Sequence, residues 1–252
     1  MSNKFRFDSK DYEFNKSSKL GVYIIHGFSS TTYETKQLAE FLGNNGFHTI
    51  AKNLPGHGTT PEECNAIKYY HWLDRIKEDI AILSSKSKKI FVIGCSMGGV
   101  LALYAASKFP INACIVGGTV LKFKNQFTIN FTNRLLCRFI KTRNKKKQVG
   151  KNMENKIKFY GYEKYPLIAL NEMRKLNQYM LYHLNKINCP SLIIHSKADR
   201  LSLQENMNII YNNIHSIEKK KLLVENSHHN LFDSNPDQKI IFEKILKFLN
   251  QY

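Results

Sequence analysis

The short stretch around Ser96 is the part of the sequence best suited to covalent chemistry. An apolar run over 90–93 ends in Gly94-Cys95-Ser96-Met97-Gly98, and an apolar pattern with helical spacing follows it. Gly-x-Ser-x-Gly between a strand and a helix is typical of a sharp turn that lifts a serine hydroxyl above a sheet. A glycine-rich turn with an incidental serine has the same letters. A catalytic interpretation therefore requires a base and an acid elsewhere in the chain.

Both groups occur later in the chain, each after a strand-like apolar stretch. Asp199 comes first, and the neighbouring histidines His228 and His229 come second. A serine becomes nucleophilic when an imidazole accepts its proton and a carboxylate orients that imidazole. Asp199 has a simpler alternative as the cap of a following helix, although Ser202 is better placed for that. We predict Ser96, Asp199 and one of the two histidines as a catalytic set.

A second glycine turn follows the first long apolar run, at His26-Gly27-Phe28. Acyl transfer needs N–H donors directed at the oxygen that becomes negative, commonly one after the nucleophile and one after an early strand. The backbone N–H groups of Met97 and Phe28 are the candidates for this oxyanion hole. We expect His26 to brace the loop rather than to transfer protons.

The order of predicted elements indicates an α/β fold. Continuous apolar runs suggest strands that are covered on both faces, and hence a mostly parallel sheet with helices on both sides. Apolar and polar residues alternate over 5–14, which predicts an antiparallel strand at the edge of the sheet. The predicted strands are 20–27, 47–56, 88–94, 112–120, 189–199 and 220–226, and the predicted helices are 32–43, 68–84, 97–109 and 240–249.

Residues 121–185 interrupt the alternation of strands and helices. They contain no convincing core strand, so we predict a helical cap inserted into an α/β core formed by 1–120 and 186–252. The apolar residues of the cap either line an acyl-chain pocket or form a small core of their own, and the second is the simpler interpretation at each position. They are Phe123, Phe127, Phe131, Leu135, Leu136, Phe139, Ile168 and Met173.

Five motifs together resemble those of the α/β-hydrolase superfamily. They read IIHGF, LPGHG, GCSMGG, HSKADRL and ENSHHNLFD, and with their strands they span residues 20 to 233. More narrowly, the sequence is similar to bacterial carboxylesterases and monoacylglycerol lipases. The likeness covers nearly the whole chain and is weakest in the cap.

The resemblance implies a role for each candidate residue. Ser96 is the nucleophile and Asp199 the acid. The family's late motif, Ser-x-His, aligns with Ser227 and His229, so His229 is the implied base. His228 remains the alternative base, because its spacing to a following aspartate fits slightly better.

The implied activity is hydrolysis of short or medium acyl esters through an acyl-enzyme, with monoacylglycerols and lysophospholipids as further substrates. No cofactor or metal is required by this chemistry, and no cluster of ligand residues suggests one. An acyltransferase or a thioesterase would use the same triad. A non-enzymatic basic protein that binds lipid or nucleic acid is a further alternative, but it has no use for an intact triad.

The charge of the chain bears on its partners. Its 252 residues include 38 Lys and Arg against 20 Asp and Glu, a net charge of +18. The excess is scattered lysine beside abundant Asn and Ile, so we attribute it to composition and expect no nucleic acid partner. The basic stretch 141–158 is a candidate for contact with anionic membrane. No signal peptide or transmembrane run is visible, which predicts a cytoplasmic protein.

Overall fold

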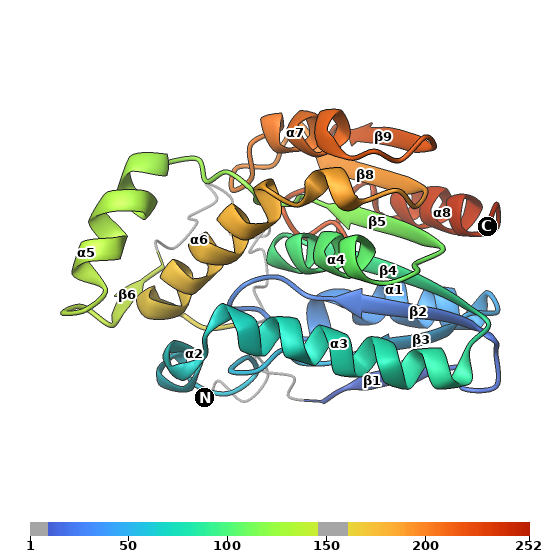
Figure 1. Ribbon diagram of the computed structural model, residues 1–252, viewed down its shortest axis with the longest axis horizontal. Coiled ribbons are helices and arrows are strands. Elements are labelled where there is room, and N and C mark those ends of the chain that lie inside the picture. The colour runs from blue at the N-terminus through green and yellow to red at the C-terminus, as the bar shows by residue number, and fades with distance from the viewer. Residues whose placement is uncertain (1–9, 146–160) are drawn as a thin grey trace.

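A mostly parallel β-sheet forms the centre of the protein (Figure 1). The computed structural model describes residues 10–145 and 161–252. Within these residues seven strands pair in the order β1-β3-β2-β4-β5-β8-β9, and only the β1–β3 pair is antiparallel. The strands are β1 (Tyr12–Phe14), β2 (Leu20–Ile25), β3 (His48–Ala51), β4 (Lys89–Cys95), β5 (Ala113–Gly117), β8 (Ser191–Ser196) and β9 (Lys219–Val224).

The six strands predicted from apolar runs are all present, and β1 confirms the predicted antiparallel edge. Burial explains why these strands could be recognised. Five of the six residues of β2 and all five of β5 are buried, as expected for strands with helices on both faces.

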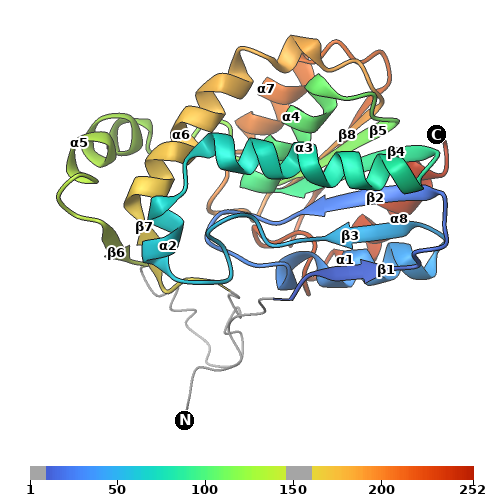
Figure 2. The same cartoon turned by 60° about the horizontal axis from the view of Figure 1, so that its bottom comes forward.

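Helices cover both faces of the sheet (Figure 2). Alternate residues of a strand point to opposite faces, so Val22 and Ile24 join one apolar layer while Tyr23 and Ile25 join the other. The first layer contains residues of α1 (Tyr33–Asn44) and α8 (Gln238–Leu249). The second contains residues of α3 (Tyr69–Lys86), α4 (Met97–Lys108) and α7 (Glu205–Asn213).

The chain between β5 and β8 begins beyond the carboxyl ends of the strands and then returns across α3 and α4 (Figures 1 and 2). Its short strands β6 and β7 pair only with each other, so the central sheet receives no strand from the described part of this segment. The elements are a π-helix (Thr128–Asn133), α5 (Arg134–Leu136), β6 (Thr142–Asn144), β7 (Lys164–Pro166), α6 (Leu167–Leu181) and a 3-10 helix (Leu184–Lys186).

One buried asparagine joins this segment to the rest of the molecule. Asn65 lies in the short helix α2 (Pro61–Ala66). Its Oδ1 accepts the N–H groups of Ile168 and Ala169 at 3.0 and 3.1 Å, in the first turn of α6. Its Nδ2 donates to the carbonyl of Lys141 at 2.9 Å. The free N–H groups at the start of α6 are therefore satisfied by a side chain from another element.

The apolar residues of the π-helix, of α5 and of the chain on either side of them do not form the small core that we considered the simpler interpretation. Six large side chains point to solvent instead, and the rings of Phe127 and Phe131 stack at 5.2 Å. Met173 is buried, but in the apolar layer that also contains residues of α3 and α4, and Phe123 packs against that same layer. The exposed fractions are 70% for Phe127, 58% for Phe131, 66% for Leu135, 43% for Leu136, 82% for Phe139 and 50% for Ile140.

Candidate active site

Ser96 occupies a strained turn between β4 and α4. Its backbone φ of 55° and ψ of −117° are rare for a residue with a side chain. Its N–H donates to the Gly117 carbonyl of the neighbouring strand at 2.9 Å, which fixes the turn against the sheet. Strain of this kind persists where the surroundings enforce it, and here it places the serine at the amino end of a buried helix. The turn is the one predicted from Gly-x-Ser-x-Gly.

The two glycines of the motif lie where the neighbouring backbone leaves no room for a side chain. A Cβ at Gly94 would lie 2.0 Å from the carbonyl oxygen of Gly98, and a Cβ at Gly98 would lie 2.1 Å from the carbonyl oxygen of Ile25. Both neighbours are backbone atoms, which cannot turn aside as a side chain can. The strand, the turn and helix α4 therefore pack closely enough only because both positions lack a side chain.

Asp199 and His229 form a direct pair. Asp199 Oδ2 lies 2.8 Å from His229 Nδ1, and the Asp199 side chain is fully buried while that of His229 is 12% exposed. Asp199 Oδ1 accepts the N–H groups of Leu201 and Ser202 at 2.8 and 3.0 Å. With Nδ1 donating to the carboxylate, Nε2 of the imidazole is left to accept a proton.

The other histidine has a different environment. His228 is exposed to solvent and makes no side-chain hydrogen bond with the residues that the structure describes. Of the two candidate bases, His229 is thus the one that contacts the candidate acid.

The pair changes the acidity of both partners. Burial alone would lower the pKa of His229, but the hydrogen bond and charge of Asp199 and the charge of Glu34 raise it above the ordinary value. Burial alone would raise the pKa of Asp199, but the bond to His229 and the two backbone N–H groups lower it. The carboxylate therefore stays ionised and favours the protonated imidazole.

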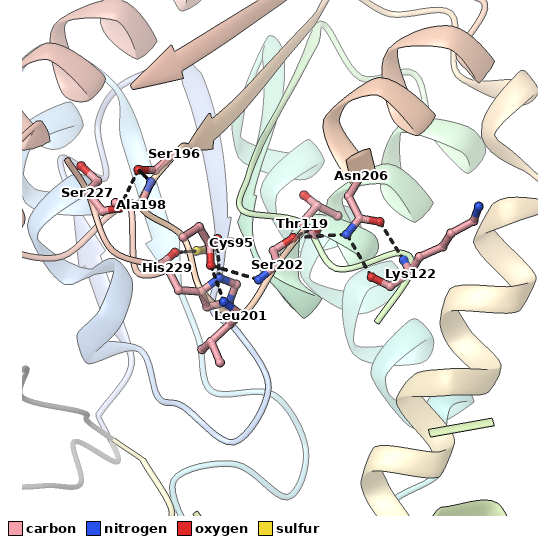
Figure 3. A network of polar contacts seen from close by, with 11 residues as sticks. Cys95, Thr119, Lys122, Ser196, Ala198, Leu201, Ser202, Asn206, Ser227 and His229 are labelled. Carbon is pink, nitrogen blue, oxygen red and sulfur yellow. Dashed lines mark hydrogen bonds and ion pairs between the residues drawn. The ribbon is translucent and has the colours of Figure 1, made fainter. Parts of the chain in front are cut away.

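The loop that carries His229 is held at its base by further polar contacts (Figure 3). Ser196 Oγ, at the end of β8, donates to the carbonyl of Ser227 at 2.6 Å. Asp237 Oδ2 accepts the N–H groups of Asn226 and Ser227 and the Ser227 hydroxyl, each at 2.8 Å. These contacts connect the loop to β8 and to the start of α8, and so fix the backbone from which the imidazole projects.

Two observations place the Asp199–His229 pair beside β4, which leads into Ser96, and beside the neighbouring strand β5. The Cys95 thiol donates to the His229 carbonyl at 3.8 Å (Figure 3). A Cβ at Gly118, after the next strand, would lie 3.4 Å from Asp199 Oδ2 and 3.5 Å from His229 Nδ1. The Ser96 hydroxyl itself has no hydrogen-bond partner among residues 10–145 and 161–252. Hydrogen bonds between nucleophile and base are often long before substrate binds.

The loop after β2 is braced by His26, as predicted. Burial lowers the pKa of His26, so the ring is neutral. Its Nε2 accepts the Leu54 N–H at 3.0 Å, and Nδ1 must then carry the proton and donate to the Gly27 carbonyl at 2.8 Å. Gly27 and Phe28 share one planar peptide, so this bond fixes the direction of the Phe28 N–H as well. Met97 begins α4, where the first N–H groups have no acceptor within the helix.

Two charged residues near this loop were not predicted. Glu34 is 2% exposed and accepts the Gly27 N–H at 3.0 Å. Lys145 donates to Ser29 Oγ at 2.8 Å, and burial lowers its pKa to about 7. The sequence gives no signal for either. An acid in the first turn of a helix and a lysine in a basic run are both normally solvated.

The described residues contain no group of three or more His, Cys, Asp or Glu side chains arranged to hold a metal ion. What they do contain is a serine in a strained strand–helix turn next to a buried Asp–His pair, on a mostly parallel sheet. These features are typical of serine hydrolases with the α/β-hydrolase fold.

Comparison with known proteins identifies the family. A family model described as serine aminopeptidase, S33, matches residues 16–236, and the chain belongs to this family. A thermostable monoacylglycerol lipase of Bacillus sp. (strain H-257) is 29% identical over 241 residues, covering 95% of this chain and 94% of that protein. A carboxylesterase of Bacillus subtilis (strain 168) is 24% identical over 244 residues, covering 96% of each.

Solved structures agree with this assignment. A structure from work on the metagenome-derived lipolytic enzymes LipS and LipT superposes with a TM-score of 0.87 at 26% identity, covering 97% of this chain and 98% of that one. A soluble variant of the monoglyceride lipase of Saccharomyces cerevisiae shares the fold with a TM-score of 0.78 at 17% identity, covering 96% of this chain and 90% of that one.

Proposed function

We propose that the protein hydrolyses carboxylic esters of short and medium acyl chain length through an acyl-enzyme on Ser96, with His229 as the base and Asp199 as the acid. One observation carries this proposal: the 2.8 Å Asp199–His229 bond lies against the strand that ends in the strained turn at Ser96. The names of the bacterial relatives, a monoacylglycerol lipase and a carboxylesterase, support an ester as the substrate.

The first half of the reaction forms the acyl-enzyme. His229 Nε2 accepts the Ser96 proton as Oγ attacks the ester carbonyl carbon, and Asp199 stabilises the imidazolium that results. The carbonyl oxygen becomes negative, and the N–H groups of Phe28 and Met97 stabilise it. Each such donor contributes about 3 to 4 kcal/mol. The C–O bond to the alcohol then breaks, and the alcohol leaves with the proton from His229.

The second half repeats these steps with water. His229 takes a proton from the water molecule, whose oxygen attacks the acyl carbon, and the bond to Ser96 Oγ breaks as the proton returns to it. The carboxylic acid product is released and the free enzyme is restored. Each proton that leaves a nucleophile is returned to a leaving group, so the cycle needs no further reactant.

We propose that residues 121–185 form a cap that selects the substrate and that its outer surface contacts lipid. The six exposed apolar residues between Phe127 and Ile140 recur at helical spacing. Residues 121–145 contain seven basic side chains and no acidic one. An apolar stripe flanked by positive charge is suited to the surface of an anionic bilayer. Of the basic stretch 141–158 predicted for this contact, residues 146–158 lie outside the described residues.

The lipid contact has a direct test. None of the helices in the described ranges has the length and apolarity to cross a bilayer, so a peripheral contact is the one to measure. We expect Phe127→Ser combined with Phe139→Ser to lower binding to vesicles containing phosphatidylglycerol roughly tenfold. Ile217→Ser is the matched control, because Ile217 is 98% exposed on another part of the surface. Equal binding of all three proteins would contradict the proposed lipid contact.

The esterase activity is tested with Ser96→Ala. Hydrolysis of p-nitrophenyl esters and monoacylglycerols of graded chain length is measured for both proteins, with a competing alcohol added to detect acyl transfer. We expect wild type to be labelled by a fluorophosphonate and Ser96→Ala to be unlabelled and inactive. Labelling or turnover that survives the substitution would place the nucleophile elsewhere, and a dominant transfer product would indicate an acyltransferase.

A further inference from the structure

Glu34 is a buried carboxylate with no part in the proposed reaction. It lies in the first turn of α1, 2% exposed, and its Oε2 accepts the Gly27 N–H at 3.0 Å. A Cβ at Gly27 would lie 3.1 Å from Ser96 Cβ and 3.3 Å from Glu34 Oε2. The carboxylate and the nucleophile therefore face the same glycine. Burying a carboxylate is costly unless hydrogen bonds and positive charge compensate it, so its position at this glycine needs an explanation.

We propose that Glu34 is a positioning residue for the esterase reaction, which holds the oxyanion loop through Gly27 and whose charge stabilises the imidazolium of His229. This inference rests on the function proposed above. Glu34 does not touch the reacting atoms and acts on them through these two residues.

The positioning role follows from the hydrogen bonds of Gly27. Its N–H is held by Glu34, and its carbonyl is held by His26 Nδ1 at 2.8 Å and by the Ser30 N–H at 3.4 Å. Both peptides that flank this glycine are thereby fixed. The second of them carries the Phe28 N–H, which we propose as an oxyanion donor. A donor fixed before the reaction does not have to reorganise as charge develops, and this is the basis of its contribution.

The electrostatic role follows from the groups around the carboxylate. The charge of Glu34 acts to raise the pKa of His229, together with the larger effect of Asp199, and also acts to raise the pKa of Lys145. Removing the charge would leave the imidazolium with Asp199 alone. Among the described residues, the titratable groups that interact electrostatically with Glu34 or His229 are His26 after β2, Cys95 at the end of β4, Lys145 after β6, His195 in β8, Asp199 after β8 and Asp233 before α8.

Two substitutions separate the roles. Glu34→Gln keeps an oxygen that can accept the Gly27 N–H but removes the charge. We expect the acid limb of kcat/KM for p-nitrophenyl butyrate to move to lower pH, and kcat to fall roughly three- to tenfold. Glu34→Asp keeps the charge but shortens the side chain by one methylene. We expect its acid limb to stay in place while kcat falls roughly tenfold, with little change in KM.

The matched control is Glu40→Gln, an exposed acid on the same helix, whose pH profile should equal that of wild type. An unmoved acid limb in Glu34→Gln, or a wild-type kcat in Glu34→Asp, would overturn the proposal. If Glu34→Gln does not fold, Glu34→Asp alone decides through its kcat. The outcomes are separate from those of the proposed function: an active Ser96→Ala refutes that function, whereas an inactive Ser96→Ala beside unchanged Glu34 variants refutes only the role of Glu34.

Discussion

Replacing Asp199 with asparagine tests how the imidazole of His229 is oriented. Asp199 Oδ1 accepts two backbone N–H groups, and Oδ2 accepts one imidazole N–H. An asparagine has a single oxygen for these three donors. Facing that oxygen to the imidazole would leave two backbone donors against an NH₂ group, and each buried donor left unpaired costs about 1 to 3 kcal/mol. The oxygen should therefore face the backbone, and the NH₂ group should face His229.

The imidazole must then accept at Nδ1 and carry its proton on Nε2. In that tautomer it cannot take the proton of Ser96. We expect kcat to fall by roughly a thousand- to ten-thousand-fold, about 4 to 5.5 kcal/mol of transition-state stabilisation. The assay is hydrolysis of p-nitrophenyl butyrate, with active sites counted by fluorophosphonate labelling and folding checked by circular dichroism. Asp74→Asn is the control, because Asp74 is 54% exposed on α3.

A loss of less than tenfold in Asp199→Asn would refute this reasoning, because the tautomer would then be set by something other than the carboxylate. A second result would be equally damaging. The structure gives His228 no role, so His228→Ala should retain activity within about twofold of wild type, a difference of less than 0.5 kcal/mol. Loss of activity in His228→Ala with activity retained in His229→Ala would reverse the assignment of the base.

Three further predictions follow from the geometry. Gly98→Ala should destabilise the protein by about 3 kcal/mol or more in urea unfolding, because its Cβ would lie 2.1 Å from the Ile25 carbonyl, and unchanged stability would show that the turn can relax. Asp237→Ala should cost about 2 to 3 kcal/mol in the same assay, since it leaves the backbone N–H groups of Asn226 and Ser227 without their acceptor. Because the pKa of Asp237 is lowered in the folded state, its stabilisation of the fold should be present at neutral pH and lost as the pH falls through the lowered pKa. A stability difference between Asp237→Ala and wild type that does not change with pH would contradict a role for the ionised carboxylate. His229 must be neutral to act as the base, and its pKa is raised. We therefore expect kcat/KM to decline on the acid side at a higher pH than an ordinary imidazole would give. A midpoint at or below about 6.5 would contradict this.

The parts of the site that could be predicted are those that depend on short local sequence motifs. The turn at Ser96 was predicted because a strained turn between a strand and a helix needs glycines at fixed positions. In the structure, neither Gly94 nor Gly98 has room for a side chain. The strands were found because continuous apolar runs mark burial on both faces. His229 was preferred over His228 only through a family motif, since the sequence does not show which of two neighbouring rings turns inward.

The parts that were missed depend on how distant segments meet. Glu34 has the sequence context of a solvated acid at a helix start, and only the return of the loop after β2 buries it against Gly27. Lys145 belongs to the basic stretch 141–158 that we considered for contact with anionic membrane, yet its side chain donates to Ser29 Oγ. Phe127 and Phe139 were grouped with the interior of the cap because apolar spacing on a helix does not reveal which side meets a neighbour.

The contact made by Asn65 has a consequence for how this scaffold can change during evolution. A single amide from α2 supplies the acceptor for the first turn of α6 and holds the chain at Lys141 on the other side. The start of α6 is thus joined to α2 by one side chain that does not belong to the proposed catalytic set. A substitution at Asn65 would therefore alter how the proposed cap is held without changing a residue of the proposed catalytic set.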